Sequence, residues 1–186
     1  MAHEHELQRG IPDEAFKTLP GDDKALASAF RKSNKEQREE AAKAAKQIRL
    51  DLIQTFRQEL KPASQNYAEL ADLPDHTPDD YAKKQARFEE ITQRKDLWRL
   101  RTLANLQVAQ FFIPKTPENR AFICTEEEYR DYLTGKRHPQ SQAVARANAL
   151  GVKERFFHWF LDFPDILGIG GFDCILGNPM PLRENH

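Results

Sequence analysis

The stretch DDKALASAFRKSNKEQREEAAKAAKQIRLDLIQTFRQEL, residues 22–60, contains no glycine or proline and consists largely of Ala, Lys, Glu, Gln and Arg. These residues are strong helix formers because they lose little side-chain freedom in a helix. Most of its apolar residues recur at spacings of three or four, which places them on one helical face; they are Leu26, Phe30, Ala41, Ala45, Ile48, Leu52, Phe56 and Leu60. The stretch therefore predicts one long helix of about 55 Å, which Pro62 is expected to end.

A second long helix is predicted from Pro78 to about Phe112. Thr77 is suited to its N-cap, and proline is favoured at the first helical position. The linker 62–78 carries three prolines and is short. Short connections bring consecutive helices side by side, so the two are expected to form an antiparallel helical hairpin.

Two shorter helices are predicted after the hairpin. Thr125 and Glu128 form a capping box at the start of a helix that reaches about Leu133. A further helix is predicted from Ser141 to Leu150, with Gly151 as its C-terminal cap. Before the hairpin, residues 1–21 contain two prolines, two glycines and little periodicity, which indicates a loop or strap.

The overall composition and net charge do not identify a binding partner. Hydrophobic residues make up 39% and charged residues 31%, and the net charge is −1. A nucleic-acid contact would therefore need a local cluster of cations. Cys124 and Cys174 form no CxxC pair, which argues against a disulfide scaffold or a zinc knuckle. The polar N-terminus and the lack of a long apolar run predict a cytoplasmic protein with no membrane contact.

The last part of the chain changes character. The run FDCILG, residues 172–177, is short, apolar and follows a glycine pair, a pattern typical of a buried strand. It ends in Asn178-Pro179, and open α/β sheets bind ligands at this carboxyl end of a strand. A buried strand needs neighbours on both sides, and no other segment of this chain predicts one. The chain is therefore expected to be mainly α, with one or a few strands at its C-terminal end, as a piece of a larger α/β domain.

The stretch FHWFLDFPDILGIGGFDCILGNP, residues 157–179, resembles the approach to the target-base motif of DNA methyltransferases that act on adenine N6. It is similar in particular to the large restriction–modification and phage-defence enzymes. The stretch GIPDEAFKTLPGDDKALASAFRKSNKEQRE, residues 10–39, also resembles a segment that opens a helical insertion in these enzymes. On this resemblance, residues 22–113 are the helical hairpin insertion, 114–155 are short helices, and 156–186 belong to the catalytic domain.

The resemblance implies roles for two residues. Such enzymes flip the target adenine out of the double-stranded DNA. Asn178 and the carbonyl beside Pro179 would accept hydrogen bonds from the adenine N6 amine and align it with the methyl group of S-adenosylmethionine. In the family a second proline and an aromatic side chain follow, and the aromatic stacks on the flipped base.

This sequence departs from that pattern. Met180 follows Pro179, the second proline is displaced by one position, and no aromatic residue follows. The glycine run at 168–171 precedes the predicted strand instead of opening a helix, so it does not replace the cofactor motif. We expect a fragment that binds no S-adenosylmethionine and transfers no methyl group alone. Its exposed apolar C-terminal segment is expected to self-associate.

A cluster of cations marks a candidate DNA-backbone contact on the first long helix. Between residues 24 and 49 there are eight Lys or Arg and three acidic residues. Such a face could follow a DNA backbone, although a merely solvated face has the same composition. The alternative function is a free-standing helical hairpin module that binds DNA or a protein. The eight cations are Lys24, Arg31, Lys32, Lys35, Arg38, Lys43, Lys46 and Arg49.

Overall fold

In a computed structural model, residues 7–92, 97–168 and 170–177 are described, the side chains of 44–57 excepted. Within these ranges every regular element is a helix, so the mainly α prediction is confirmed. The elements are η1 (Asp13–Phe16), α2 (Lys24–Ala71), α3 (Pro78–Thr92), α4 (Trp98–Ala109), η3 (Pro117–Phe122), α5 (Glu126–Leu133), α6 (Gln142–Lys153), α7 (Trp159–Asp162) and α8 (Pro164–Gly168).

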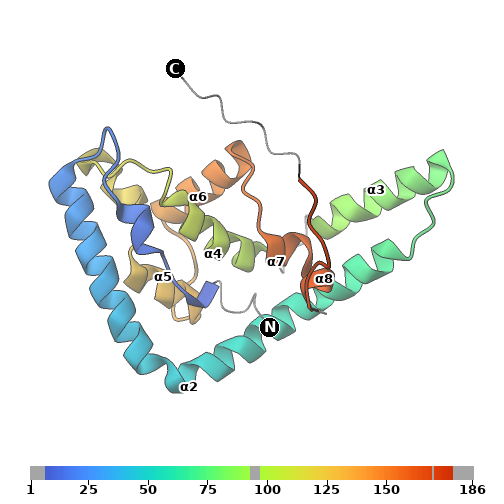
Figure 1. Cartoon of the computed structure of the whole chain (residues 1–186), viewed down its shortest axis with the longest axis horizontal. Coiled ribbons are helices and arrows are strands. Elements are labelled where there is room, and N and C mark those ends of the chain that lie inside the picture. Colours follow the sequence, from blue (N-terminus) through green and yellow to red (C-terminus); the bar gives the residue numbers. More distant parts are fainter. Residues whose placement is uncertain (1–6, 93–96, 169, 178–186) are drawn as a thin grey trace.

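The long helix α2 begins at the expected place. The Asp23 side chain accepts a hydrogen bond from the Leu26 amide at 2.9 Å and caps the helix. The prediction that Pro62 ends the helix is wrong, since α2 continues to Ala71. A proline inside a helix costs about 3 kcal/mol. Burial of Ala63 and Tyr67, which follow within two turns, offsets this cost. Figure 1 shows α2 bent in its middle, well before Pro62.

The predicted hairpin of two long helices is found only in a shorter form, in which α3 runs back along the end of the bent helix α2 after a turn at residues 72–77. The end of α2 runs beside α3, where the rings of Tyr67 and Phe88 meet edge to face at 6.4 Å. The Arg87 guanidinium donates to Asn66 Oδ1 at 2.8 Å across the same pair of helices. The predicted second helix, 78–112, is found as α3 and α4; the residues that join them lie outside the described part.

Helix α4 lies at the centre of the body and packs most extensively on α6. Leu100, Leu103 and Leu106 are fully buried on it. The surrounding core also takes in Leu7 near one end of the described chain and Leu167 near the other. One hydrophobic core therefore joins segments from both ends of the described chain, whereas the buried Ile91 of α3 lies outside it.

The caps of the short helices are confirmed. Thr125 Oγ1 accepts from the Glu128 amide at 3.2 Å, and Ser141 Oγ accepts from the Val144 amide at 3.3 Å. Gly151 is not a cap as predicted, because α6 continues to Lys153. A Cβ at Gly151 would lie only 2.8 Å from Asn105 Nδ2, so glycine here lets α6 approach α4.

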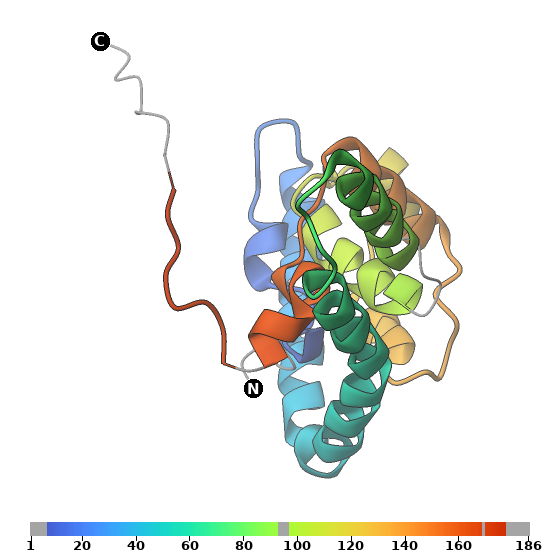
Figure 2. The same cartoon turned by 90° about the vertical axis from the view of Figure 1, so that its right-hand side faces the viewer.

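The C-terminal strand prediction is wrong for the residues that the structure describes. Residues 172–177 form an extended coil with no ladder, and Ile175 and Leu176 are exposed. A strand needs a partner for its backbone groups, and the helical body offers no sheet edge. Figure 2 shows this segment leaving the body. In the described part, no helix is long and apolar enough to cross a bilayer.

Candidate functional site

The segment that leads to the predicted target-base loop begins with α7 and α8. The Gly171 amide donates to Ile166 O at 3.0 Å, and Gly170 and Gly171 have φ values of 132° and 109°. The glycine run 168–171 thus ends α8 and redirects the chain into the extended segment 172–177. Asn178 and Pro179, the predicted catalytic residues, lie outside the described residues.

Four aromatic rings gather on the surface where this segment leaves the body. We call Phe157, Trp159, Phe163 and Phe172 the aromatic cluster. Trp159 and Phe163 each meet the Phe172 ring edge to face, at 5.6 and 5.2 Å between centroids. Phe157 lies 5.0 Å from Trp159, and both side chains are about half exposed. Three of the four aromatic residues lie within seven positions of the sequence, but their spacing does not predict the exposed surface that they form.

A buried chain of polar groups holds α7 in place beneath the cluster. Asn105 donates from Nδ2 to Asn148 Oδ1 at 2.9 Å, and Asn148 donates to Thr102 Oγ1 at 3.2 Å. Asn105 Oδ1 therefore faces His158 Nε2, at 2.7 Å. The neutral imidazole with its hydrogen on Nε2 fits this chain. The only signal of these asparagines in the sequence is a polar side chain on an otherwise apolar helical face, buried for Asn105 and partly buried for Asn148.

His158 is a neutral structural group in this setting. Burial, and then the nearby Arg101 guanidinium, lower the pKa of His158 to about 4, and the carboxylate of Asp162 only partly opposes them. The same carboxylate accepts from the His158 amide at 2.9 Å and pairs with Arg101 at 3.5 Å. Because the ring is buried and its Nε2 is engaged, the geometry fits a positioning residue for α7.

The cations of α2 divide into two groups. Lys24, Arg31, Lys32, Lys35 and Lys43 are exposed, whereas Arg38 turns toward η1 and pairs with Asp13 at 3.2 Å. The side chains of Lys46 and Arg49 lie outside the described part. Lys32 and Lys35 lie 4.0 and 3.9 Å from glutamates one turn later. Exposed pairs of this kind contribute little energy, so both cations remain available to a phosphate.

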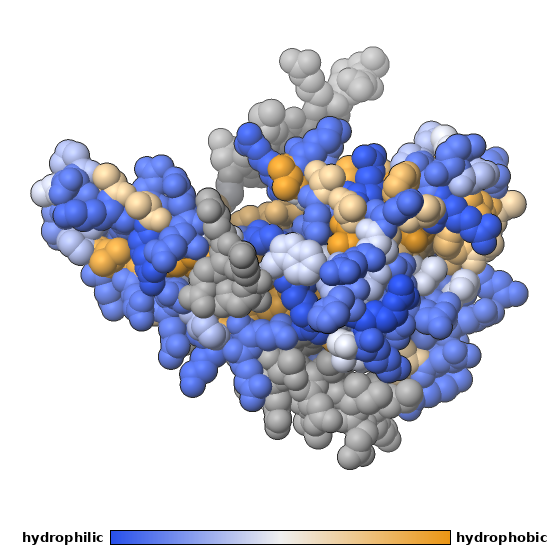
Figure 3. All heavy atoms as spheres, turned by 180° about the vertical axis from the view of Figure 1, so that it is seen from behind, coloured by the Kyte–Doolittle hydropathy of each residue, from blue (hydrophilic) through white to orange (hydrophobic). Residues whose placement is uncertain are grey.

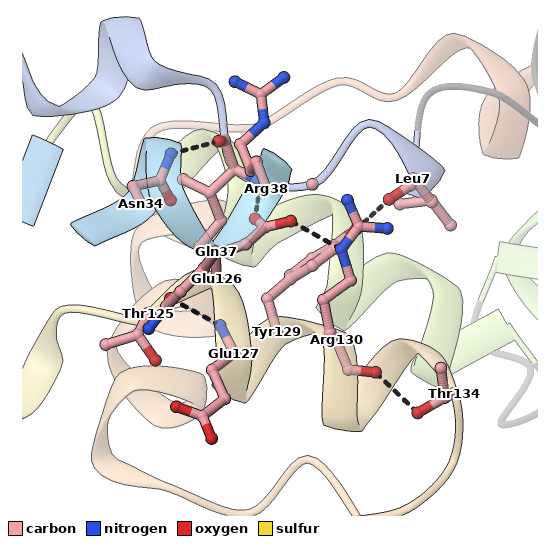
Figure 4. A network of polar contacts seen from close by, with 12 residues as sticks. Leu7, Asn34, Gln37, Arg38, Thr125, Glu126, Glu127, Tyr129, Arg130 and Thr134 are labelled. Atoms are coloured by element: carbon pink, nitrogen blue, oxygen red, sulfur yellow. Dashed lines mark hydrogen bonds and ion pairs between the residues drawn. The ribbon is translucent and has the colours of Figure 1, made fainter. Parts of the chain in front are cut away.

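The N-terminal strap is built into the body through a second polar network, drawn in Figure 4. Glu126 is fully buried, and its carboxylate accepts from the Ile11 amide at 2.7 Å and from Arg130 Nε at 2.6 Å. The Tyr129 hydroxyl donates to Leu7 O at 2.8 Å. Asn34 Nδ2 donates to Ile11 O at 2.9 Å. Desolvation raises the pKa of Glu126, while Arg130 opposes the shift. These contacts position the strap against α2 and α5 around a fully buried carboxylate.

Metal ligands do not gather in the described ranges, where no group of three His, Cys, Asp or Glu side chains could hold an ion. His3-Glu4-His5-Glu6 lies outside them. An open hollow of about 490 Å³ borders the start of α2 and η3, with Asp23 and Arg120 as its charged lining residues. The face in Figure 3 is mainly hydrophilic over body and hairpin, with small hydrophobic patches. Comparison of the chain with known protein families, curated proteins and solved structures found no match.

Proposed function

We propose that the chain is the helical insertion, with the target-base strand and loop, of an adenine-N6 DNA methyltransferase of the restriction–modification or phage-defence type. The observation that carries the proposal is the state of residues 172–177. Their sequence is that of a buried strand, yet Ile175 is 70% and Leu176 94% exposed. Apolar residues that the body leaves uncovered fit a strand whose neighbours come from a catalytic domain.

The proposed chemistry of this chain's own residues is limited to the target base. Asn178 would accept a hydrogen bond from the amine of a flipped adenine through its side-chain oxygen, and Pro179 would restrict the direction of the loop. Such acceptors act by orienting the amine before the reaction.

S-adenosylmethionine, which the family uses as methyl donor, does not fit the glycine run of this chain. The Gly171 amide is already bonded to Ile166 O, and the run ends a helix instead of beginning one. Helix N-termini and free amides are what a cofactor turn offers. The cofactor would therefore be held by residues other than 168–171, and the described residues are proposed to be inactive in methyl transfer by themselves.

Double-stranded DNA is the proposed substrate, and the exposed cations of α2 are its proposed backbone contact. Each phosphate neutralised by a cation contributes about −0.9 to the slope of log affinity against log salt. With four phosphates contacted, the slope would be about −3.6. A solvated face without DNA contact would give no such dependence.

A free-standing helical module is the second candidate, and the closed core favours it. The core extends from Leu7 to Leu167, so the helical body has an interior of its own. In this reading the exposed face of α2 binds DNA or a protein, and residues 172–177 have no role in catalysis.

Two measurements test these readings. The source DNA on both sides of the coding region should be sequenced and translated in every frame. A glycine-rich cofactor motif upstream and a proline–aromatic continuation downstream would support the methyltransferase proposal. If both are absent and the reading frame has its own start and stop signals, the free-standing helical module is supported instead.

The second measurement is duplex DNA binding by fluorescence anisotropy across a salt series. The double variant Lys32→Glu/Lys35→Glu should weaken binding at least tenfold at low salt and make the slope shallower by about 2. Lys83→Glu/Lys153→Glu is the matched control, because it changes the net charge equally at similarly exposed positions off α2. Equal losses in both variants, or a flat salt response, would remove the DNA contact on α2.

A further inference from the structure

The stretch from the end of α5 to the end of α6 carries positive charge without an acidic residue. Residues 132–153 contain four Lys or Arg and no Asp or Glu, although the whole chain has 28 Lys or Arg and 29 acidic residues. The last of these cations, Lys153, pairs with Glu154 at 2.8 Å. Three cations remain around the start of α6, and a polyanion that approaches them meets no carboxylate on this stretch. They are Lys136, Arg137 and Arg146.

The loop between α5 and α6 is held in a defined shape against the body. The Arg137 amide donates to Asp131 O at 3.2 Å, and its guanidinium lies over the Tyr132 ring, 5.6 Å from the centroid. Pro139 is buried. Between these anchors, Lys136 is exposed, and its side chain makes no ion pair or hydrogen bond within the described part of the chain. The loop therefore presents an open cation at a fixed place before α6.

Helix α6 turns a face of small and polar side chains outward. Figure 1 shows α6 at the edge of the helical body, and its inner face packs on α4. Gln142, Ala145, Arg146 and Ala149 are exposed in its first two turns. Three of them, all but Ala145, fall within about 60° of the helix surface. The Arg146 guanidinium has no hydrogen bond or ion pair in the described ranges. Because alanine side chains are short, another molecule can come close to the helix here.

The shape and charge of this surface fit duplex DNA. An α-helix with its side chains is about 10–12 Å across, and the major groove of B-form DNA, about 12 Å wide, admits it. Glutamine and arginine can hydrogen-bond to base edges from a helix in the groove, and cations beside the helix can contact phosphates. Duplex RNA is a poorer fit, because side chains cannot read its deep and narrow major groove.

We propose that α6 lies in the major groove of duplex DNA and is a second DNA contact of the chain. Gln142 and Arg146 face the bases. Lys136 and Arg137 contact phosphates beside the groove. The inference shares its ligand with the proposed function, but it depends neither on the α2 face nor on methyl transfer. Two phosphate contacts give a salt slope of about −1.8, which makes α6 the weaker of the two contacts.

Duplex binding by a chain without the α2 contact tests the assignment. In the α2 double variant, the remaining binding of a short labelled duplex is measured by fluorescence anisotropy at low salt. Adding Lys136→Glu/Arg146→Glu should weaken it at least tenfold. Lys61→Glu/Lys83→Glu is the matched control, because it changes the net charge equally at exposed positions outside both surfaces. All four side chains are exposed, so circular dichroism should show an unchanged helical fold. Equal losses in the two variants would overturn the proposal.

The two DNA contacts can fail independently. If the α2 double variant binds duplex DNA as well as the wild type does, the α2 contact is refuted. The α6 variant is then measured in the wild-type chain, with the same expected loss and the same control. If the α2 contact is supported but the α6 variant loses no further affinity, only the α6 assignment is overturned.

A modified duplex separates a groove contact from a backbone contact. The C5 position of a pyrimidine faces the major groove, so a bulky C5 substituent on the cytosines fills the groove and leaves the phosphates unchanged. Binding by the α2 double variant should fall at least tenfold on this duplex, and also on duplex RNA of the same sequence. Undiminished binding to either one would show that α6 does not enter the major groove.

Discussion

Acidification should destabilise the helical body through His158. The folded protein holds this imidazole at a pKa of about 4, against an ordinary value of 6.5. Between these two values the unfolded chain binds a proton that the folded chain excludes, so stability falls as the pH falls. From pH 7 to pH 5 the two pKa values give a loss of about 2 kcal/mol, and the loss approaches 3 kcal/mol below pH 4. Above about pH 7.5 the imidazole is neutral in both states and contributes little pH dependence.

The assay is urea unfolding followed by circular dichroism at pH 7 and pH 5, for wild type and for His158→Gln. Glutamine keeps an amide donor for Asn105 Oδ1 but does not titrate. Glu126 contributes with the opposite sign, because its pKa is raised in the folded protein. Its contribution is common to both proteins, so the difference between them isolates His158. If wild type and variant lose the same stability between the two pH values, the buried neutral imidazole is refuted.

Three further substitutions test the backbone. Gly10→Ala should lower the free energy of unfolding by about 2–4 kcal/mol, because the added Cβ would lie 2.1 Å from the buried Glu126 Oε1 and φ is +74°. Gly21→Ala is the control, since Gly21 has φ +93° but open space around it. It should lower the free energy of unfolding, measured with urea, by only about 1 kcal/mol. Arg155→Gly should raise the free energy of unfolding by about 1 kcal/mol, because Arg155 holds φ 53° where α6 ends; unchanged or lower stability would show that the arginine side chain offsets its own backbone strain.

The parts of the fold that the sequence predicted are those decided locally. Thr125 and Ser141 cap their helices because a side-chain oxygen three residues before an amide needs no tertiary partner. The prediction that Pro62 ends the helix was wrong because neighbouring elements bury Ala63 and Tyr67. This burial outweighs the local free-energy cost of a proline inside a helix. The partners of Asn105 and Glu126 were not predictable either. They depend on which helical faces meet, and periodicity does not fix that.

At the C-terminal segment, by contrast, a clear local pattern gave a wrong prediction. Residues 172–177 have a strong strand pattern, and a pattern describes the environment that a segment requires, not whether the chain supplies it. Here the helical body does not supply it. The methyltransferase proposal places the missing neighbours in a catalytic domain.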